Sequence, residues 1–311
     1  MPDVRPYDPS QADAWDDAVA RSVNGTFLHT RRYLGYHGDR FRDLSVTVDG
    51  AVLAAAADPG DATRVVSHPG LTYGGLVHDG SLRGEALLDA LRAVAAHYRE
   101  LGYATLRYKA VPSIYHREPA QDDLYALFRL GARLYRRDLS ATVELAAGTA
   151  PRGDRRRNPR VAERRGATLV DGPEHLDAFW RVLTDSLARR HGATPVHTAA
   201  ELRELIARFP DRITVETVHV AGEVVAGTVH YVTDRVLHCQ YSAASPEGAK
   251  AYALDLAFAT AIDRCRAAGL PFYDFGVSTE SDGTVLNASL YDFKTSFGAR
   301  GTVCDFYELD L

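Results

Sequence analysis

The chain has 311 residues, of which 46% are hydrophobic, and a formal net charge of −5. This length predicts two domains with packed cores, and no apolar run approaches the roughly 20 residues of a membrane span. The negative charge argues against an overall nucleic-acid-binding surface but leaves room for a local basic patch. The three cysteines are widely spaced, and the acidic N-terminus does not resemble a signal peptide, so we expect a cytoplasmic protein.

The first half of the chain shows alternating helix and strand patterns. Apolar residues at helical spacing predict a long helix over residues 82–101, and alternating apolar residues predict a hairpin over 44–57. Shorter segments complete this half, with helices near 11–21, 31–40 and 122–130, and strands within 64–77, 103–109 and 139–145.

The second half has sharper patterns. A capping box, Thr198 to Glu201, opens a helix that Pro210 ends, and turns near Gly222 and Asp234 separate three strand-like runs. The predicted elements are strand 167–170, helices 174–190 and 198–209, strands 213–220, 223–232 and 235–243, helix 248–268, strand 272–276, helix 288–297 and strand 302–309.

This order, β-α-α-β-β-β-α-β-α-β, is similar to the topology of the Gcn5-related N-acetyltransferases (GNAT). The first half repeats the order faintly, without a residue-level repeat. We therefore expect an α/β (α+β) protein with two tandem GNAT-like domains and mixed sheets. The predicted domains cover 1–148 and 167–311. They are joined by a basic segment, 149–166, with seven arginines and two acidic residues.

Several stretches carry a family resemblance. FLHTRRYL near the N-terminus, RRRNPRVAERRGATL before the second domain and FKTSFGA near the end resemble the FemAB/FemX family. Members of that family are aminoacyl-tRNA-dependent transferases that build peptidoglycan bridges. RHGATPVHT, HCQYSAAS and DFGVSTESDGTVLNASL are closer to a FemAB-like branch from polysaccharide and natural-product gene clusters. The resemblance implies an N-acyltransferase that forms an amide on an amine of a small molecule, sugar or peptide.

Lysine is rare in this chain, because only Lys109, Lys250 and Lys294 occur among 36 cationic residues. A retained lysine suggests a need for a compact ammonium group rather than a guanidinium. In the resembled family a Phe-Lys pair lies at the reaction centre, and its lysine stabilises developing negative charge. Phe293 and Lys294 match that pair, so we expect them to be catalytic. The alternative is a surface lysine beside an apolar stripe.

Asp274 begins a DFG triplet, but the glycine-rich loop, VAIK strand and HRD motif of protein kinases are missing from the sequence. In a GNAT sheet it would lie at the end of the fifth strand, where it could accept a proton or orient the nucleophile. The alternative is a cap of the following loop. Neighbouring candidates for substrate binding are Ser278, Gln240, Tyr241 and Asn287, the last of which could instead cap a helix.

Further residues are candidates for contacts with the acceptor. Lys109 ends a strand of the first domain and is followed by Tyr115 and His116, for which the resemblance implies contacts with the acceptor or with a phosphate. His191 and His197 flank the loop between the first two helices of the second domain, although a lone histidine is more often structural. No HExxH motif or close cluster of His, Asp and Cys supports a metal site.

The acyl donor remains open between two chemistries. Coenzyme-A-binding GNAT proteins carry RxxGxG/A after the fourth strand, where backbone N–H groups hold a pyrophosphate. Here that place reads SPEGAKAY, with one glycine and a glutamate. We therefore expect aminoacyl-tRNA as co-substrate, with phosphate contacts from Arg155, Arg156, Arg157 and Arg160. We expect no tightly bound cofactor and no DNA partner. The alternatives are an acyl-CoA-dependent enzyme and a non-catalytic tRNA-binding or scaffold protein.

Overall fold

The computed structural model describes residues 2–148, 150–191 and 194–311. By contacts the chain divides into two units that each combine helices with a sheet, as the α/β class requires. The first unit holds Met1–Leu139, Thr279–Leu286 and Thr302–Leu311. The second holds Ser140–Ser278 and Asn287–Gly301. Among the described residues, no helix combines the length and hydrophobicity needed to cross a bilayer.

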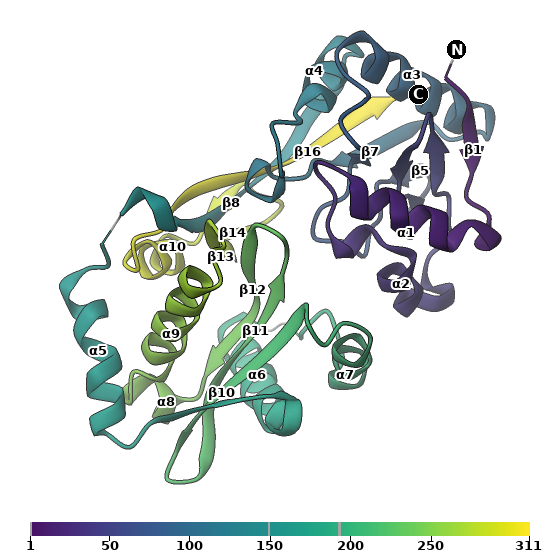
Figure 1. Ribbon diagram of the computed structural model, residues 1–311. Helices are drawn as coiled ribbons and strands as arrows, with labels where there is room; N and C mark the ends of the chain where they lie inside the picture. The colour runs from purple at the N-terminus through teal and green to yellow at the C-terminus, as the bar shows by residue number, and fades with distance from the viewer. Residues whose placement is uncertain (1, 149, 192–193) are drawn as a thin grey trace. The chain divides into compact units, whose positions relative to one another are not determined.

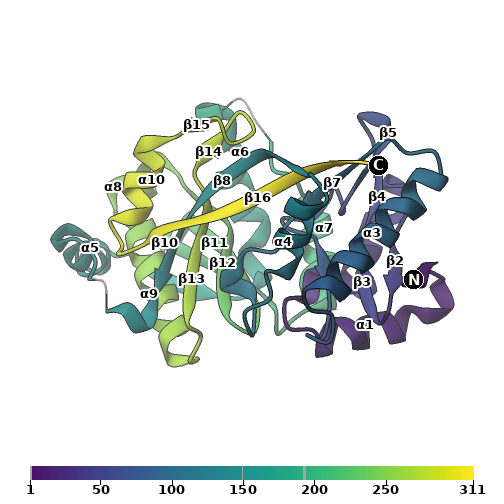
Figure 2. The same ribbon diagram turned by 90° about the horizontal axis from the view of Figure 1, so that it is seen from above.

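The first unit packs its helices on two groups of strands (Figures 1 and 2). Its helices are α1 (Ala12–Arg21), α2 (Arg31–Leu34), α3 (Glu85–Glu100) and α4 (Asp122–Arg129). One sheet has the order β1 (Val4–Pro6), β2 (Val46–Val48), β3 (Ala51–Leu53) and β6 (Leu76–Val77). The other strands run in the order β4 (Ala56–Asp58), β5 (Asp61–Val66), β7 (Thr105–Lys109) and β16 (Arg300–Asp310). A two-stranded hairpin, β14 (Thr279–Glu280) and β15 (Val285–Leu286), completes the unit.

The second unit is a mixed sheet between helices. Its strands run in the order β8 (Arg133–Glu144), β13 (Phe272–Val277), β12 (Val236–Ala244), β11 (Glu223–Val232), β10 (Ile213–Val220) and β9 (Thr168–Asp171). Its helices are α5 (Gly153–Arg164), α6 (Leu176–His191), α7 (Ala199–Arg208), α8 (Pro246–Lys250), α9 (Ala253–Ala267) and α10 (Ala288–Thr295). The predicted capping box is present, because Thr198 and Glu201 hydrogen-bond each other's backbone at the start of α7.

Each unit includes strand residues from the other half of the chain. β8, the final strand of the predicted first domain, pairs through its second half with β13, where Thr142 lies opposite Asp274. The final strand of the chain, β16, pairs with β7, where Phe306 lies opposite Lys109. The units therefore differ from the contiguous domains 1–148 and 167–311 that the sequence predicted, since each includes residues from the other half.

Helices α6 and α9 cover opposite faces of the second sheet (Figure 1). Ala226 of β11 packs in the apolar cluster of α9, whereas a Cβ on the next residue, Gly227, would collide with Phe179 of α6. Successive residues of a strand point to opposite faces, so the two helices lie on different sides. The predicted helix 248–268 is in fact the pair α8 and α9, because Tyr252 adopts a left-handed backbone with φ 60°.

Candidate functional site

The second sheet opens where β12 and β13 stop pairing. Their parallel register runs only to His238 opposite Asp274. On β12 the next residues form a bulge, since Cys239 and Tyr241 have partners on β11 and Gln240 is skipped. On β13, Gly276 has a φ of +76°, a conformation that favours glycine. Beyond this point the two strands diverge and leave room for side chains or a ligand.

Asp274 is buried at the last paired position, with 3% of its surface exposed. Its Oδ1 accepts hydrogen bonds from Ser140 Oγ at 2.5 Å and Thr142 Oγ1 at 2.9 Å, both on β8. Its Oδ2 accepts from His238 Nδ1 at 2.8 Å. Burial alone would raise the pKa of Asp274, but His238 and the two hydroxyls hold that pKa below its ordinary value. These three partners lie on the strands beside β13, which favours a role within the sheet over a cap of the following loop.

His238 was not among the candidates from sequence. It is the first residue of the stretch HCQYSAAS, to which the resemblance assigned no role for the histidine. The available signal was its position between Leu237 and Cys239, which both face the core. Strand alternation turns His238 to the other face of the sheet. Its partner Asp274 comes from a strand 36 residues later, and that pairing required the structure.

Lys294 lies on α10 and reaches the open end of β13. Only 8% of its surface is exposed, and its Nζ donates to the carbonyl oxygens of Gly276 at 2.8 Å and Val277 at 2.7 Å. Burial lowers the pKa of Lys294 to about 8, against the opposing charge of Asp274. Lys294 is therefore not a solvated surface residue, and one of its three N–H donors has no hydrogen-bond acceptor among the described residues.

Phe293 and the start of α10 line a cavity of about 580 Å³. Asn287 is the N-cap of α10, because its Oδ1 accepts from the backbone N–H of Leu290 at 3.0 Å. The other walls are the end of β12, the start of α9, Arg155 of α5, Ala249 of α8 and Ser186 of α6. The cavity thus lies at the end of β12, among helices of the second unit.

Two buried polar atoms near this opening, Oε1 of Gln240 and Oγ of Ser278, lack a hydrogen-bond partner among the described residues. Unsatisfied buried polar groups are costly in folded proteins. A polar ligand at the opening would complete the hydrogen bonds of both groups.

Two of the predicted acceptor-binding residues meet on the α6 side. Tyr241 Oη lies 2.6 Å from His197 Nδ1, and the Tyr241 ring packs edge-on against Trp180 of α6 at 5.1 Å between centroids. The bulge at Gln240 is what turns Tyr241 to this face. The side chain of His191 lies outside the described part of the structure.

The basic segment forms α5, and its arginines divide into two groups. Arg155 points inward: Nη1 donates to Asp255 at 2.7 Å, Nε to Ser296 at 2.8 Å, and the guanidinium stacks 4.6 Å from the Phe293 ring. Arg155 thus anchors α5 to α9 and α10, and its phosphate contact stays a prediction. Arg156, Arg157 and Arg160 are exposed, and within the described residues their side chains have no hydrogen bond or ion pair.

The first-unit candidates are held by the protein's own backbone. Lys109 Nζ donates to the carbonyl oxygens of Pro69 at 3.2 Å and Leu71 at 2.7 Å, and burial lowers the pKa of Lys109 to about 8. His116 Nε2 lies 3.0 Å from the carbonyl oxygen of Val111. Tyr115 is buried and packs 4.4 Å from the ring of Tyr73. These contacts fix loops of the first unit.

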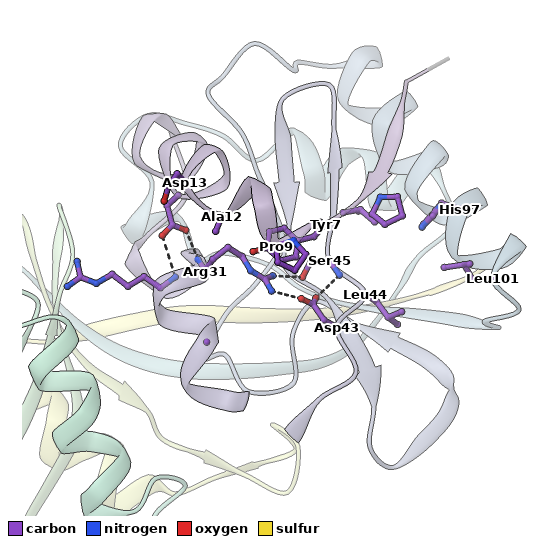
Figure 3. Close-up of a pocket in the computed structure, with 15 residues that line it drawn as sticks. Tyr7, Pro9, Ala12, Asp13, Arg31, Asp43, Leu44, Ser45, His97 and Leu101 are labelled. Atoms are coloured by element: carbon purple, nitrogen blue, oxygen red, sulfur yellow. Dashed lines mark hydrogen bonds and ion pairs between the residues drawn. The ribbon is translucent and has the colours of Figure 1, made fainter. Parts of the chain in front are cut away.

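A second cavity, of about 790 Å³, lies in the first unit (Figure 3). Arg31 projects along its wall, stacks 3.6 Å from the Tyr7 ring centroid and donates to Ser45 Oγ at 3.1 Å and to Asp43. Its backbone N–H donates to Asp16 at 2.5 Å. These contacts hold Arg31 in a network of the first unit's own residues.

Comparison with known proteins agrees with this architecture. The acetyltransferase (GNAT) domain family matches residues 151–294, the range that contains the diverging strands and Lys294. No curated protein matches the chain by sequence. The match assigns a GNAT domain to that part of the chain.

Individual solved structures have a similar fold over the whole chain. FemX matches with a TM-score of 0.69 and 13% identity, over 99% of this chain and 97% of FemX. L-PGS from Bacillus licheniformis matches with a TM-score of 0.61 and 14% identity, over 98% and 93%. A tandem GNAT protein from the clavulanic acid biosynthesis pathway matches with a TM-score of 0.54 and 13% identity, over 100% and 98%. The chain therefore has a FemX-like fold, as the sequence resemblance predicted.

The lowered pKa of Lys294 predicts a pH-dependent contribution to stability. Above pH 8 the folded protein releases this proton, while the unfolded chain keeps it up to its ordinary pKa of roughly 10.4. The contribution of Lys294 to the free energy of unfolding should therefore rise with pH within this window. Between pH 7.5 and 9.5 the stability of the wild type relative to Lys294→Met should rise by about 2 kcal/mol.

Urea denaturation of both proteins at the two pH values measures this difference. Lys250→Met, which removes a lysine that is exposed on α8, controls for the loss of one charge. A difference between wild type and Lys294→Met that stays constant with pH would show that the ammonium of Lys294 is not desolvated as the structure indicates.

Proposed function

We propose that this protein is an N-acyltransferase that forms an amide on an amine acceptor, with aminoacyl-tRNA as its acyl donor. The observation that carries the proposal is the pair Phe293 and Lys294. Phe293 lines the second-unit cavity, and the Lys294 ammonium binds two carbonyl oxygens where β13 leaves β12, with one N–H that has no acceptor among the described residues. FemX and the L-PGS of Bacillus licheniformis share the fold.

The chemistry needs no covalent enzyme intermediate. The acceptor amine attacks the carbonyl carbon of the donor ester, and a negative charge develops on the carbonyl oxygen. The two carbonyl oxygens that bind Lys294 fix its ammonium, and the remaining N–H can stabilise that oxyanion without reorganisation. A buried, oriented charge of this kind acts mainly on the transition state.

The segment between β12 and α9 argues against a coenzyme A pyrophosphate. Ser245 caps α8, and its Oγ accepts from the Gly248 N–H at 3.1 Å while its carbonyl oxygen accepts from Ala249 N–H at 2.9 Å. Glu247 adds an exposed carboxylate in the first turn of the same helix. The N–H groups that would bind a phosphate are thus partly used, and the local charge repels it.

The exposed arginines of α5 support a larger polyanion. Arg156, Arg157 and Arg160 lie within five residues on the helix that packs on α9 through Arg155 and Asp255. Unpaired guanidinium groups at this spacing suit successive phosphates of a nucleic acid. The acetyltransferase family match supports acetyl-CoA as the second candidate donor.

A donor competition experiment tests the proposal. The protein is incubated with total aminoacyl-tRNA or with acetyl-CoA, and with a panel of amino-sugar and amino-acid acceptors, while amide products are followed by mass spectrometry. We expect product only with aminoacyl-tRNA, and loss of that product after ribonuclease treatment. Ribonuclease-insensitive transfer from acetyl-CoA would contradict the proposed donor.

The same assay includes a charge-matched pair of triple variants. Replacing Arg156, Arg157 and Arg160 by glutamine should weaken tRNA binding and reduce the slope of log K against log[salt] by up to about 2–3, because each lost phosphate contact contributes roughly 0.7–0.9. The control replaces three exposed arginines elsewhere, Arg92, Arg99 and Arg266. Equal salt slopes in the two variants would remove α5 from the tRNA-binding surface.

Lys294→Met tests the catalytic step separately from binding. Methionine keeps an unbranched apolar stem but removes the charge, so turnover should fall by about 10²–10³ while donor affinity changes far less. Lys294→Arg should also be slow, since a planar fork cannot replace a compact ammonium between two carbonyl oxygens. Single-turnover rates and tRNA binding give the two quantities. Unchanged turnover in folded Lys294→Met would limit Phe293 and Lys294 to packing.

A further inference from the structure

We propose that the second-unit cavity binds the 3′-terminal adenine of the tRNA, and that Asp255 and Arg155 recognise this base. The inference rests on the proposed transfer from aminoacyl-tRNA and adds a substrate contact to it. Both residues line the cavity, together with Phe293, the neighbour of Lys294. The sequence predicted a phosphate contact for Arg155 and no role for Asp255.

Asp255 has one carboxylate oxygen without a donor. The residue lies in the first turn of α9, and only 5% of its surface is exposed. Its two donors, Arg155 Nη1 at 2.7 Å and Asn158 Nδ2 at 2.8 Å, both bind Oδ1. Oδ2 has no hydrogen bond to the described residues, yet it is not fully enclosed by protein. Because Asp255 lines the cavity, this oxygen is available to an N–H group of a ligand there.

Arg155 contributes the complementary group. Its Nη1 donates to Asp255 and its Nε donates to Ser296 Oγ at 2.8 Å, which leaves Nη2 without an acceptor among the described residues. Stacking holds the guanidinium in place, since it lies 4.6 Å from the centre of the Phe293 ring and 5.2 Å from that of Phe297. The cavity wall therefore presents a fixed donor, Nη2, next to a fixed acceptor, Oδ2.

The charges of this pair select a neutral ligand. The guanidinium of Arg155 compensates the carboxylate of Asp255, so the pair gives no net attraction for an ammonium or a phosphate. A ligand that satisfies both atoms offers an N–H donor and a lone-pair acceptor side by side. Adenine does so, because its N6 amino group adjoins ring nitrogens with lone pairs. Guanine and hypoxanthine carry an acceptor oxygen in place of that amino group, and this oxygen would face Oδ2 unfavourably.

Tyr252 gives the cavity an aromatic wall. It lies between α8 and α9, is partly exposed and lines the cavity. Its left-handed backbone, with φ 60°, is uncommon for a residue with a side chain and persists only where the surrounding structure requires it. Arg165 stacks on its ring at 5.0 Å. Aromatic rings are the usual platforms for unstacked RNA bases, so this wall suits a flat base.

The position of the cavity fits the covalent structure of the donor. In aminoacyl-tRNA the acyl ester is on the ribose of the terminal adenosine, so one sugar separates the acyl group from the base. Phe293 at the cavity and the adjacent Lys294 provide the corresponding protein groups, an aromatic wall and a charge for the ester carbonyl. The exposed Arg156, Arg157 and Arg160 lie on the same helix as Arg155, where the phosphates that precede the base would follow.

Binding of uncharged RNA tests the base contact without acyl transfer. The probe is a fluorescein-labelled hairpin that copies a tRNA acceptor stem and ends in CCA, and a second probe ends in CC-inosine. Wild-type protein should bind the adenine end about 5–100-fold more tightly by fluorescence anisotropy at one salt concentration, because matched base contacts discriminate to that extent. Equal affinities for the two probes, or binding of neither, would overturn the proposal.

Asp255→Asn tests the acceptor atom. The carbonyl oxygen of asparagine can still accept from Arg155 and Asn158, and its amide then presents N–H groups in place of Oδ2. The variant should bind the inosine end at least as tightly as the adenine end. The control is Asp263→Asn on the same helix, which removes an exposed carboxylate paired with Arg266 and should keep the wild-type preference.

Circular dichroism and thermal unfolding check that Asp255→Asn is folded, and the comparison of the two probes on wild-type protein does not depend on it. A folded variant that keeps the adenine preference would refute the contact from Asp255.

The outcomes separate this inference from the proposed function. An adenine preference in binding, without amide formation from any aminoacyl-tRNA, would support the base contact and refute only the proposed function. Equal use of adenine-ended and inosine-ended aminoacyl donors would support the function and overturn the base contact. Coenzyme A carries the same base, so it is titrated in parallel. Binding of coenzyme A that is weakened in Asp255→Asn, with no binding of either RNA, would assign the adenine to coenzyme A and overturn the tRNA contact.

Discussion

The second unit depends on one buried carboxylate. Asp274 lies in the middle of the sheet, where an unpaired charge would cost several kcal/mol, and its three donors come from the strands on either side. Ser140 and Thr142 belong to β8, so the carboxylate requires a strand from the first half of the chain. The position of β8 in the second sheet and the hydrogen bonding of Asp274 are therefore linked. β13 needs both β8 and β12 beside it, because its buried carboxylate takes donors from both strands.

The same contact determines where the sheet opens. Pairing between β12 and β13 ends at Asp274, and the bulge at Gln240 and the left-handed Gly276 prevent it from continuing. The diverging backbone of β13 leaves carbonyl oxygens that its neighbour cannot satisfy, and Lys294 supplies donors to two of them. Lys294 thus stabilises the diverging backbone of β13. The same contacts orient its ammonium group, which is the charge proposed to act in acyl transfer.

Local sequence patterns predicted most elements but not their pairing. Strands 213–220 and 223–232 match the structure at both ends, because alternation and turn residues are local signals. The exchange of β8 and β16 could not be predicted, since either strand has a pattern that fits either sheet. His238 was missed because its partner is distant in sequence. The bond of Arg155 to Asp255 could not be predicted, because charge composition does not distinguish a helix side that packs on a carboxylate from one that faces solvent.

The distribution of charge around the second-unit cavity favours one kind of donor over another. In a coenzyme A thioester the pyrophosphate must lie close to the start of the helix after β12, where Ser245 and Glu247 already occupy or oppose that position. In an aminoacyl ester of tRNA, the successive phosphates extend away from the acyl group. They would contact cations that lie outside the cavity. The free arginines of α5 are such cations, while Arg155 on the same helix anchors it to α9. One helix can thus combine a fixed inner side with a phosphate-binding outer side.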